Sequence, residues 1–414
     1  MIKRYMMRRY IKITLLLLVA VSVSGNTAGQ SIFSLNYIGE HQFRGGARSI
    51  ALGLSALAVQ DSNMAGTMNT ATLSDLSAVT LSVTEKLHMS RISYQKEESN
   101  QSRFLLPSVV VAVPLTEGLV FSAGYRTRFA GRADFTFPGE LVGDESSSAS
   151  EPSEEYELDS SLYSVPFGLS WRINEWVSIG GELQIERGSI TDGVTITFEN
   201  SDYGSSHSER KRTFSATSWS LSFLAKLHPR FYIAGVFDGG IGYSVNEYIT
   251  HARSEFNSTD SWSFDLPPAY SGGVAVGLSD RWWITSAFWL RDAPDASGFS
   301  VFQGALGTEK LYSVGLERRA DKKGNNWFSR MPLRMGFYEN TWHIEIPGGE
   351  PVKSRFFTLG SGFGIPGGDG NLDWTLEFGR VGSTERNGID ETVFRFSVSL
   401  GISEAWEKRI IEKH

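Results

Sequence analysis

The feature that most constrains this chain is a strict alternation of apolar and polar residues that persists for about nine positions at a time. From Val165 to Ile173, and again from Val177 to Ile185, every second residue is apolar except for one glycine, and most of the others are polar. A period of two indicates an extended strand with one apolar and one polar face. Because only a short turn around Asn174 and Glu175 separates the two runs, they predict an antiparallel hairpin.

The same pattern fills most of the chain from about Leu76 to Ser403 and predicts roughly fourteen strands. Clear examples are the runs Val109–Leu115, Leu119–Tyr125, Trp219–Leu227, Phe231–Phe237, Leu372–Phe378 and Phe394–Ile402. Tight turns alternate with long polar loops at 137–158, 200–211, 247–262 and 292–308. Short turns on one side and long loops on the other are typical of outer-membrane barrels. The segment that begins at Ala320 falls where a short turn is due, so it is either a longer periplasmic loop or a wrongly placed strand boundary.

The strands of a secreted sandwich or propeller also alternate between apolar and polar residues, but strand length distinguishes these folds from a membrane barrel. Soluble strands cluster around five or six residues, whereas a tilted membrane strand needs about nine to eleven. The sequence therefore predicts an all-β fold, a transmembrane antiparallel β-barrel of about fourteen strands. In this barrel Leu169 and Trp171 face lipid, whereas Arg172 and Glu182 face the lumen, because a one-residue slip would place a charge in the bilayer.

The N-terminus predicts a secretory signal peptide over residues 1–29. Five cations precede an apolar segment from Ile13 to Val23, and small residues follow it. The chain carries a net charge of −7 and no cysteine, and removing the five cations of the signal peptide leaves −12. An acidic exported chain argues against nucleic acid as a partner. The lack of cysteine excludes a disulfide scaffold.

The sequence offers no constellation for catalysis or metal binding. The seven histidines are scattered, with no two at ligand spacing. A literal G-x-G-x-x-G at Gly362–Gly367 leads into a turn and another strand rather than a helix, so it does not predict a dinucleotide site. A calcium-loop-like stretch from Asp369 lacks the required glycine and glutamate and is better explained as a hairpin turn. We therefore expect no cofactor, no metal and no enzymatic activity.

Three segments resemble the FadL/TodX family of outer-membrane transporters for hydrophobic compounds. They are "GARSIALGLSALAVQDSNMAGTMNTATL" from Gly46, "FDLPPAYSGGVAVGLSDRWWITSAFW" from Phe264 and "MPLRMGFY" from Met331. The resemblance implies a plug over residues 30–75, inside a barrel over residues 76–403, with a charged periplasmic tail at 404–414. The implied plug motif consists of Gly46, Ala47, Arg48, Gly53, Ala56, Asp61 and Asn69.

Two plug positions and the C-terminus depart from the family pattern. The usual Gly-Gly reads Leu54-Ser55, and Asn-Pro-Ala reads Asn69-Thr70-Ala71. Losing that proline frees the local backbone angle. The chain also continues beyond Ser403 with a charged segment instead of ending on an aromatic residue.

Strand parity places several charged side chains in the lumen, and their role has two interpretations. The cations are Arg126, Arg128, Arg172, Lys226, Arg334 and Arg395, and the acids are Glu182, Glu186, Asp373 and Glu377. These groups either neutralise one another, or one cation binds the carboxylate of a ligand whose apolar tail lies on the plug. The candidate ligand-binding residues are Arg126, Arg172, Ile50, Leu52, Leu54 and Leu57.

The leading functional prediction is passive passage of long-chain fatty acids or aromatic hydrocarbons across the outer membrane. The alternatives are a barrel that serves protein secretion or cell-surface assembly, as the shuttle protein of the type IX system does, or a purely structural barrel. The expected partners are outer-membrane lipid and lipopolysaccharide, hydrophobic small molecules and, in the alternative, secretion partners. The acidic, serine-rich loop after Phe137 is interpreted as solvated surface or as a divalent-ion bridge to lipopolysaccharide.

Overall fold

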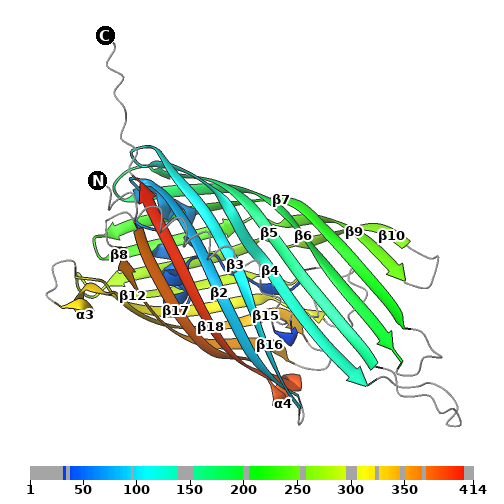
Figure 1. Ribbon diagram of the computed structural model, residues 1–414. Coiled ribbons are helices and arrows are strands. Elements are labelled where there is room, and N and C mark those ends of the chain that lie inside the picture. The colour runs from blue at the N-terminus through cyan, green and yellow to red at the C-terminus, as the bar shows by residue number, and fades with distance from the viewer. Residues whose placement is uncertain are drawn as a thin grey trace, which may run out of the picture.

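The alternating segments pair edge to edge until the sheet closes on itself, which gives a barrel with the N-terminal segment inside (Figure 1). This computed structural model describes residues 31–33, 38–94, 97–138, 153–198, 205–251, 258–294, 305–321, 326–345, 350–365 and 370–404. The predicted signal peptide, the charged tail from 405 onward and the serine-rich loop from 139 to 152 lie outside these ranges. No helix among the described residues is long and apolar enough to cross a membrane.

The wall is antiparallel throughout, and β18 pairs with β2 to close it. β8 and β9 are segments of one interrupted strand, as are β10 and β11, so the wall has 14 strands. The segments are β2 (Val79–Tyr94), β3 (Glu97–Thr116), β4 (Leu119–Pro138), β5 (Ser153–Arg172), β6 (Val177–Thr197), β7 (Ser206–His228), β8 (Phe231–Asp238), β9 (Ile241–His251), β10 (Ser258–Leu266), β11 (Ala269–Gly277), β12 (Trp282–Arg291), β14 (Glu309–Arg318), β15 (Leu333–Glu345), β16 (Pro351–Gly364), β17 (Gly370–Ser383) and β18 (Ile389–Glu404).

The remaining elements are short. Inside the barrel lie β1 (Glu40–His41), α2 (Ala47–Ala51) and the 3-10 turns η2 (Ala56–Ala58) and η3 (Thr70–Asp75). The others are β13 (Ala305–Leu306), which pairs with β15, α3 (Trp327–Arg330) and α4 (Thr384–Asn387). The plug predicted inside the barrel is confirmed, and so is the strand number.

The predicted register of the opening hairpin is confirmed. In β5 and β6, Leu169 lies opposite Gly181 and Trp171 opposite Ile179. Leu169 and Trp171 are 48% and 51% exposed on the outer face, whereas Glu182 is buried and only 5% exposed. Large apolar side chains are exposed outward around the wall, where hydrocarbon rather than water suits them. Examples are Phe121, Leu183, Leu221, Phe288, Tyr312, Phe357 and Phe378.

The two ends of the barrel differ in their connections. The first residue of β2 pairs with the last of β18, and the short turns after β3, β5, β7 and β11 share that end. We call it the turn end and the opposite one the loop end; in outer-membrane barrels these face the periplasm and the exterior. The segment from Ala320 that contains α3 joins β14 to β15 at the turn end, so it is a longer connection there and not a displaced strand.

The wall is irregular in two places. Gly239 and Gly240 lie opposite Pro268 and Pro267, so a proline pair without N–H groups interrupts the ladder while the register continues on both sides. The second irregularity lies between β3 and β4, whose pairing runs from Thr116 with Leu119 only as far as Ser108 with Arg126. Nearer the loop end, the edge of β4 pairs instead with the plug strand β1.

Figure 1 makes the second irregularity visible, because β2 and β3 run towards α4 while β4 and β5 run to a separate part of the loop end. At the same level, next to Pro107 in β3, the ladder between β2 and β3 has a register shift between Thr84 and Lys86. Backbone groups left unpaired at membrane depth are costly. The plug therefore supplies part of the hydrogen bonding that the wall itself lacks.

A charge on the outer face tests the membrane assignment. We expect Leu183→Arg, on the apolar band of β6, to lower the free energy of unfolding by about 2–4 kcal/mol in lipid vesicles. Leu227→Arg, at the turn end of β7, should cost only about 0–1 kcal/mol, because its guanidinium can reach the interface. Denaturant titrations of both variants measure the difference. Equal costs in the two variants would contradict the placement of the band.

Candidate functional site: the plug inside the lumen

The plug crosses the lumen from the loop end to the turn end. Phe33 packs edge-on against Trp342 of β15 with ring centroids 6.5 Å apart, near the loop end. Further along, α2 lies against β15, β16 and β17, and η3 lies against β5, β6 and β7 near the turn end. Hydrogen bonds to wall hydroxyls fix α2: the Ala47 amide donates to Ser399 Oγ at 2.7 Å, and Thr358 Oγ1 donates to the Ala51 carbonyl at 2.8 Å.

Two glycines let the plug backbone contact the wall backbone. Gly53 has φ +63°, and a Cβ added there would lie 2.7 Å from the Phe337 amide nitrogen. A Cβ added to Gly336 of β15 would lie 2.3 Å from the Gly53 nitrogen. Leu54, where the family pattern has a glycine, also has a positive φ of 62°. A non-glycine residue in this region costs roughly 1–2 kcal/mol, so the plug is held in a strained shape by its surroundings.

Arg48 joins the plug to the wall through a buried chain of charges. Its guanidinium donates to both carboxylate oxygens of Glu317 in β14, at 3.0 and 2.9 Å, and to Asp61 of the plug at 2.9 Å. Glu317 also accepts from Arg334, which donates to Asp373 at 2.6 Å. Burial by itself lowers the pKa of Arg48, but the Glu317 and Asp61 carboxylates outweigh it and raise that pKa, so the guanidinium stays charged.

A second charge network lies around Glu182 of β6. Arg126 binds both oxygens of this carboxylate, at 2.7 and 2.9 Å. Thr70 of the plug donates its hydroxyl to Glu182 at 2.7 Å, and Arg44 of the plug lies 3.6 Å from the same carboxylate. Arg44 in turn donates to Asp238 at 2.6 Å. In this structure Arg126 is therefore paired with a lumen acid, as in the first of the two interpretations of the lumen charges.

Glu40 and His41, the two residues of β1, also contact charged side chains of the wall. Glu40 accepts from Arg395 of β18 at 2.5 Å, and that guanidinium also donates to the Nδ1 of His88 at 3.1 Å. His41 Nδ1 lies 3.1 Å from Glu309 of β14. Burial lowers the pKa of His41 despite this neighbouring carboxylate. Buried charges of this kind are tolerated because each has a partner.

Asn69 holds the turn-end part of the plug with all its amide atoms. Its side-chain oxygen accepts from the Ala71 amide at 2.9 Å, which caps η3. Its side-chain nitrogen donates to the carbonyls of Leu57 at 3.2 Å and Phe223 at 2.9 Å. This asparagine fixes the turn even though the following proline of the family pattern is a threonine here.

The spaces left between plug and wall are small. Four interior cavities that border residues 40–68 in the described part of the chain have volumes of about 40, 30, 20 and 10 Å³. A site for a small molecule usually needs about 300–1,000 Å³, whereas a single water needs about 10–15 Å³. These cavities therefore suit one or a few waters and not a fatty acid.

The predicted site residues lie as follows. The plug motif of Gly46, Ala47, Arg48, Gly53, Ala56, Asp61 and Asn69 belongs to the segment inside the lumen. Among the candidate ligand-binding residues, Arg126 is engaged by Glu182, and Arg172 lies near the turn end, 3.8 Å from Asp75. Ile50 and Leu54 pack in one apolar cluster, and Leu52 and Leu57 in another. Their role in ligand binding stays a prediction.

The residues of the lumen that sequence reasoning missed include Arg44, Glu309 and Glu317. The two glutamates lie on the inward face of β14 and are each 2% exposed. The alternation around Tyr312, Val314 and Leu316 carried enough signal to place Glu317 inward. Nothing local distinguishes Arg44, because its partners Glu182 and Asp238 are far away in the sequence.

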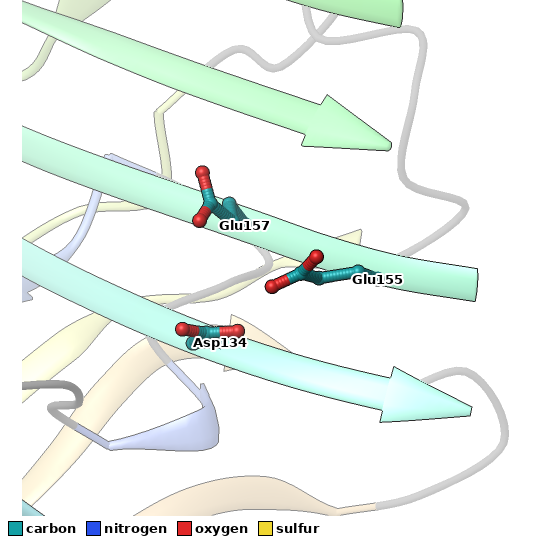
Figure 2. A group of neighbouring side chains, drawn as sticks. All are labelled: Asp134, Glu155 and Glu157. Carbon is teal, nitrogen blue, oxygen red and sulfur yellow. The ribbon is translucent and has the colours of Figure 1, made fainter. Parts of the chain in front are cut away.

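Three carboxylates gather on the outer face near the loop end. They are Asp134 of β4 and Glu155 and Glu157 of β5, whose oxygens lie within 4.8 Å of one another (Figure 2). Asp134 lies directly opposite Glu157 in the ladder, and all three are exposed. Exposed acidic groups are common without an ion. The absence of a metal stays a prediction for this chain.

Comparison with known proteins shows the family of this chain and proteins with a similar fold. A family model described as BamG matches residues 1–230 and 241–411. The chain belongs to the BamG family. A search among curated proteins found no match. Among solved structures, a FadL homologue of Pseudomonas aeruginosa has a TM-score of 0.61 at 11% identity, covering 88% of this chain and 99% of that one.

Two hydrocarbon channels have a similar fold. The CymD monoaromatic hydrocarbon channel has a TM-score of 0.55 at 12% identity, covering 89% of this chain and 100% of that one. The Pseudomonas putida toluene transporter TodX has a TM-score of 0.53 at 13% identity, covering 88% and 100%. The resemblance to the FadL/TodX family is thus confirmed at the level of the fold.

Removing the guanidinium of Arg48 tests the first charge chain. We expect Arg48→Gln to lower the free energy of unfolding by about 3 kcal/mol, because the buried Glu317 loses one of its cations and the partly buried Asp61 loses its ion pair. The control is Arg230→Gln, whose ion pair with Asp280 is solvent-exposed and should cost no more than about 1 kcal/mol. Denaturant unfolding in detergent measures both. Equal costs would mean that Arg48 does not hold the plug.

A side chain at Gly336 tests the close backbone approach. Gly336→Val should displace the plug around Gly53 and raise hydrogen exchange of the amides in residues 46–58, measured by mass spectrometry. The matched control is Gly181→Val, because a Cβ at this wall position would make only ordinary contacts, with Leu221 at 3.6 Å and the Ser220 carbonyl at 3.8 Å. Unchanged exchange in Gly336→Val would show that the two backbones do not meet there.

Proposed function

We propose that this chain is a plugged outer-membrane barrel that serves as a non-enzymatic subunit in the assembly of proteins at the outer membrane. Membership of the BamG family suggests an assembly role. The observation that carries the proposal is the packing of the plug against the wall, where four interior cavities beside residues 40–68 measure only about 10–40 Å³ each. A barrel closed in this way presents its outer wall and its two ends to partners.

The energetics of the plug favour a fixed lumen over an open one. Withdrawing the plug would break the contacts of Arg48 with Glu317, Glu40 with Arg395 and Arg44 with Asp238. Separating one partner from a buried ion pair typically costs about 3–5 kcal/mol. The edge of β4 that β1 covers would also lose its backbone partner. Together these costs disfavour complete withdrawal of the plug in every transport cycle.

Passage of long-chain fatty acids or aromatic hydrocarbons is the second candidate function. The observation that favours it is the divergence of β3 and β4 towards the loop end, where the ladder stops at Ser108 and Arg126. A hydrophobic molecule could enter the wall there if β1 moved away from β4. The similar fold of CymD, described as a monoaromatic hydrocarbon channel, is a second argument. Neither argument names a ligand for this chain.

An engineered crosslink between plug and wall separates the two functions. The chain contains no cysteine, and a Cβ added to Gly46 would lie 2.9 Å from Ser399 Oγ, so the pair Gly46→Cys and Ser399→Cys is placed to form a disulfide. We expect the oxidised variant to restore the amounts of other outer-membrane proteins in a depleted strain as well as the wild type does. Uptake of labelled fatty acid and toluene is measured in the same cells.

The outcomes assign the function. If depletion leaves other outer-membrane proteins unchanged but lowers uptake, and oxidation of the crosslink blocks that uptake, the chain is a transporter and the assembly role is wrong. Reduction of the disulfide in the same preparation controls for damage by the two substitutions. A loss of surface proteins that neither the wild type nor the crosslinked variant restores would point to an indirect effect of depletion.

A further inference from the structure

The loop end of the outer wall carries a groove that the plug and lumen do not explain. It has a volume of about 720 Å³ and is bounded by α4 and the loop-end parts of β16, β17 and β18. Four cations, Lys353, Arg355, Arg380 and Arg386, line it, together with the acids Glu385 and Asp390. Two phenylalanines, Phe357 and Phe378, form its apolar part.

Strand register places these side chains in two rows on the outer face. The row nearer the membrane centre is aromatic: Phe337 lies opposite Phe357, Phe357 opposite Phe378, and Phe378 opposite Phe394. The next row towards the loop end is polar, with Glu339 opposite Arg355 and Arg355 opposite Arg380. Aromatic side chains mark the interface of a membrane barrel, so the cations lie at the level of the lipid headgroups.

The charges in the polar row are not balanced within the wall. Arg355 contacts Glu339 at 2.5 Å, Lys353 lies 3.8 Å from the same acid, and Arg386 contacts Glu350 at 3.0 Å. Arg380 makes no ion pair with any residue in the described part of the chain. Two like charges directly opposite each other in a ladder are destabilising. An anion between Arg355 and Arg380 would relieve that repulsion.

We infer that this groove binds a phosphorylated lipid of the outer leaflet, with its phosphate between Arg355 and Arg380 and its acyl chains on the phenylalanine row. Guanidinium groups bind phosphate oxygens through paired hydrogen bonds, and a compact lysine adds a further positive charge. The phenylalanine row favours a lipid over a water-soluble anion, because Phe357 is 68% exposed just below the cations. The inference is independent of the proposed function of the barrel.

Binding of diphosphoryl lipid A to the detergent-purified mature chain tests the inference. Native mass spectrometry in EDTA gives the lipid-bound fraction without divalent bridges to Glu385 or Asp390. We expect Arg355→Gln with Arg380→Gln to weaken binding at least about tenfold, since two charge-assisted contacts are lost. The control is Lys211→Gln, an exposed cation near the loop end of β7, which should leave binding unchanged. The heat-modifiable mobility of each variant reports folding.

Three outcomes would overturn the inference: binding unaffected by the double substitution, equal weakening by Lys211→Gln, or equal binding of a neutral lipid with the same acyl chains. Competition with inorganic phosphate distinguishes a lipid site from a site for free phosphate. If millimolar phosphate displaces bound lipid A as effectively as unlabelled lipid A does, the groove is a free-phosphate site and the lipid assignment is wrong. Phe357→Ser with Phe378→Ser should weaken lipid binding, whereas binding at a free-phosphate site would not change with these two substitutions.

Discussion

The structure depends on the requirement that every backbone amide in contact with hydrocarbon finds a partner inside the protein. A sheet meets that requirement only by closing on itself, which β18 does by pairing with β2 along its whole length. Closure fixes the two faces of every strand at once, so apolar residues go outward and charged residues inward. The lumen is therefore polar by construction, and something must neutralise its buried charges.

The plug meets that second need, and it also repairs the wall. Arg44, Arg48 and Glu40 of the plug pair with Asp238, Glu317 and Arg395 of the wall. Its strand β1 occupies the edge of β4 where β3 has diverged. Plug and wall are thus one folded unit, in contrast to a pore with a loosely held stopper. This coupling supports the proposal that partners contact the outer wall and not the lumen.

The outer wall carries different side chains on different sides of the barrel. Its apolar band ends at the phenylalanine row on β15–β18, and cations follow one step further towards the loop end. On β4 and β5 the same end of the barrel is acidic, with Asp134, Glu155 and Glu157 close together. Carboxylates thus gather on one side of the loop end, whereas on the other side arginines follow the phenylalanine row.

The sequence alone determined the barrel and its strand number, because the alternation of apolar and polar residues can be read within each strand. It also determined the outward face of Leu169 and Trp171 and the inward face of Glu182, because any other register would place a charge in the hydrocarbon. A resemblance of small-residue segments pointed to the plug. Only the tertiary structure decided which charges pair, since Arg48 meets Glu317 across 269 positions of sequence. The split between β3 and β4 and the alignment of Arg355 with Arg380 were likewise hidden, because they depend on pairing between strands and not on any pattern within one.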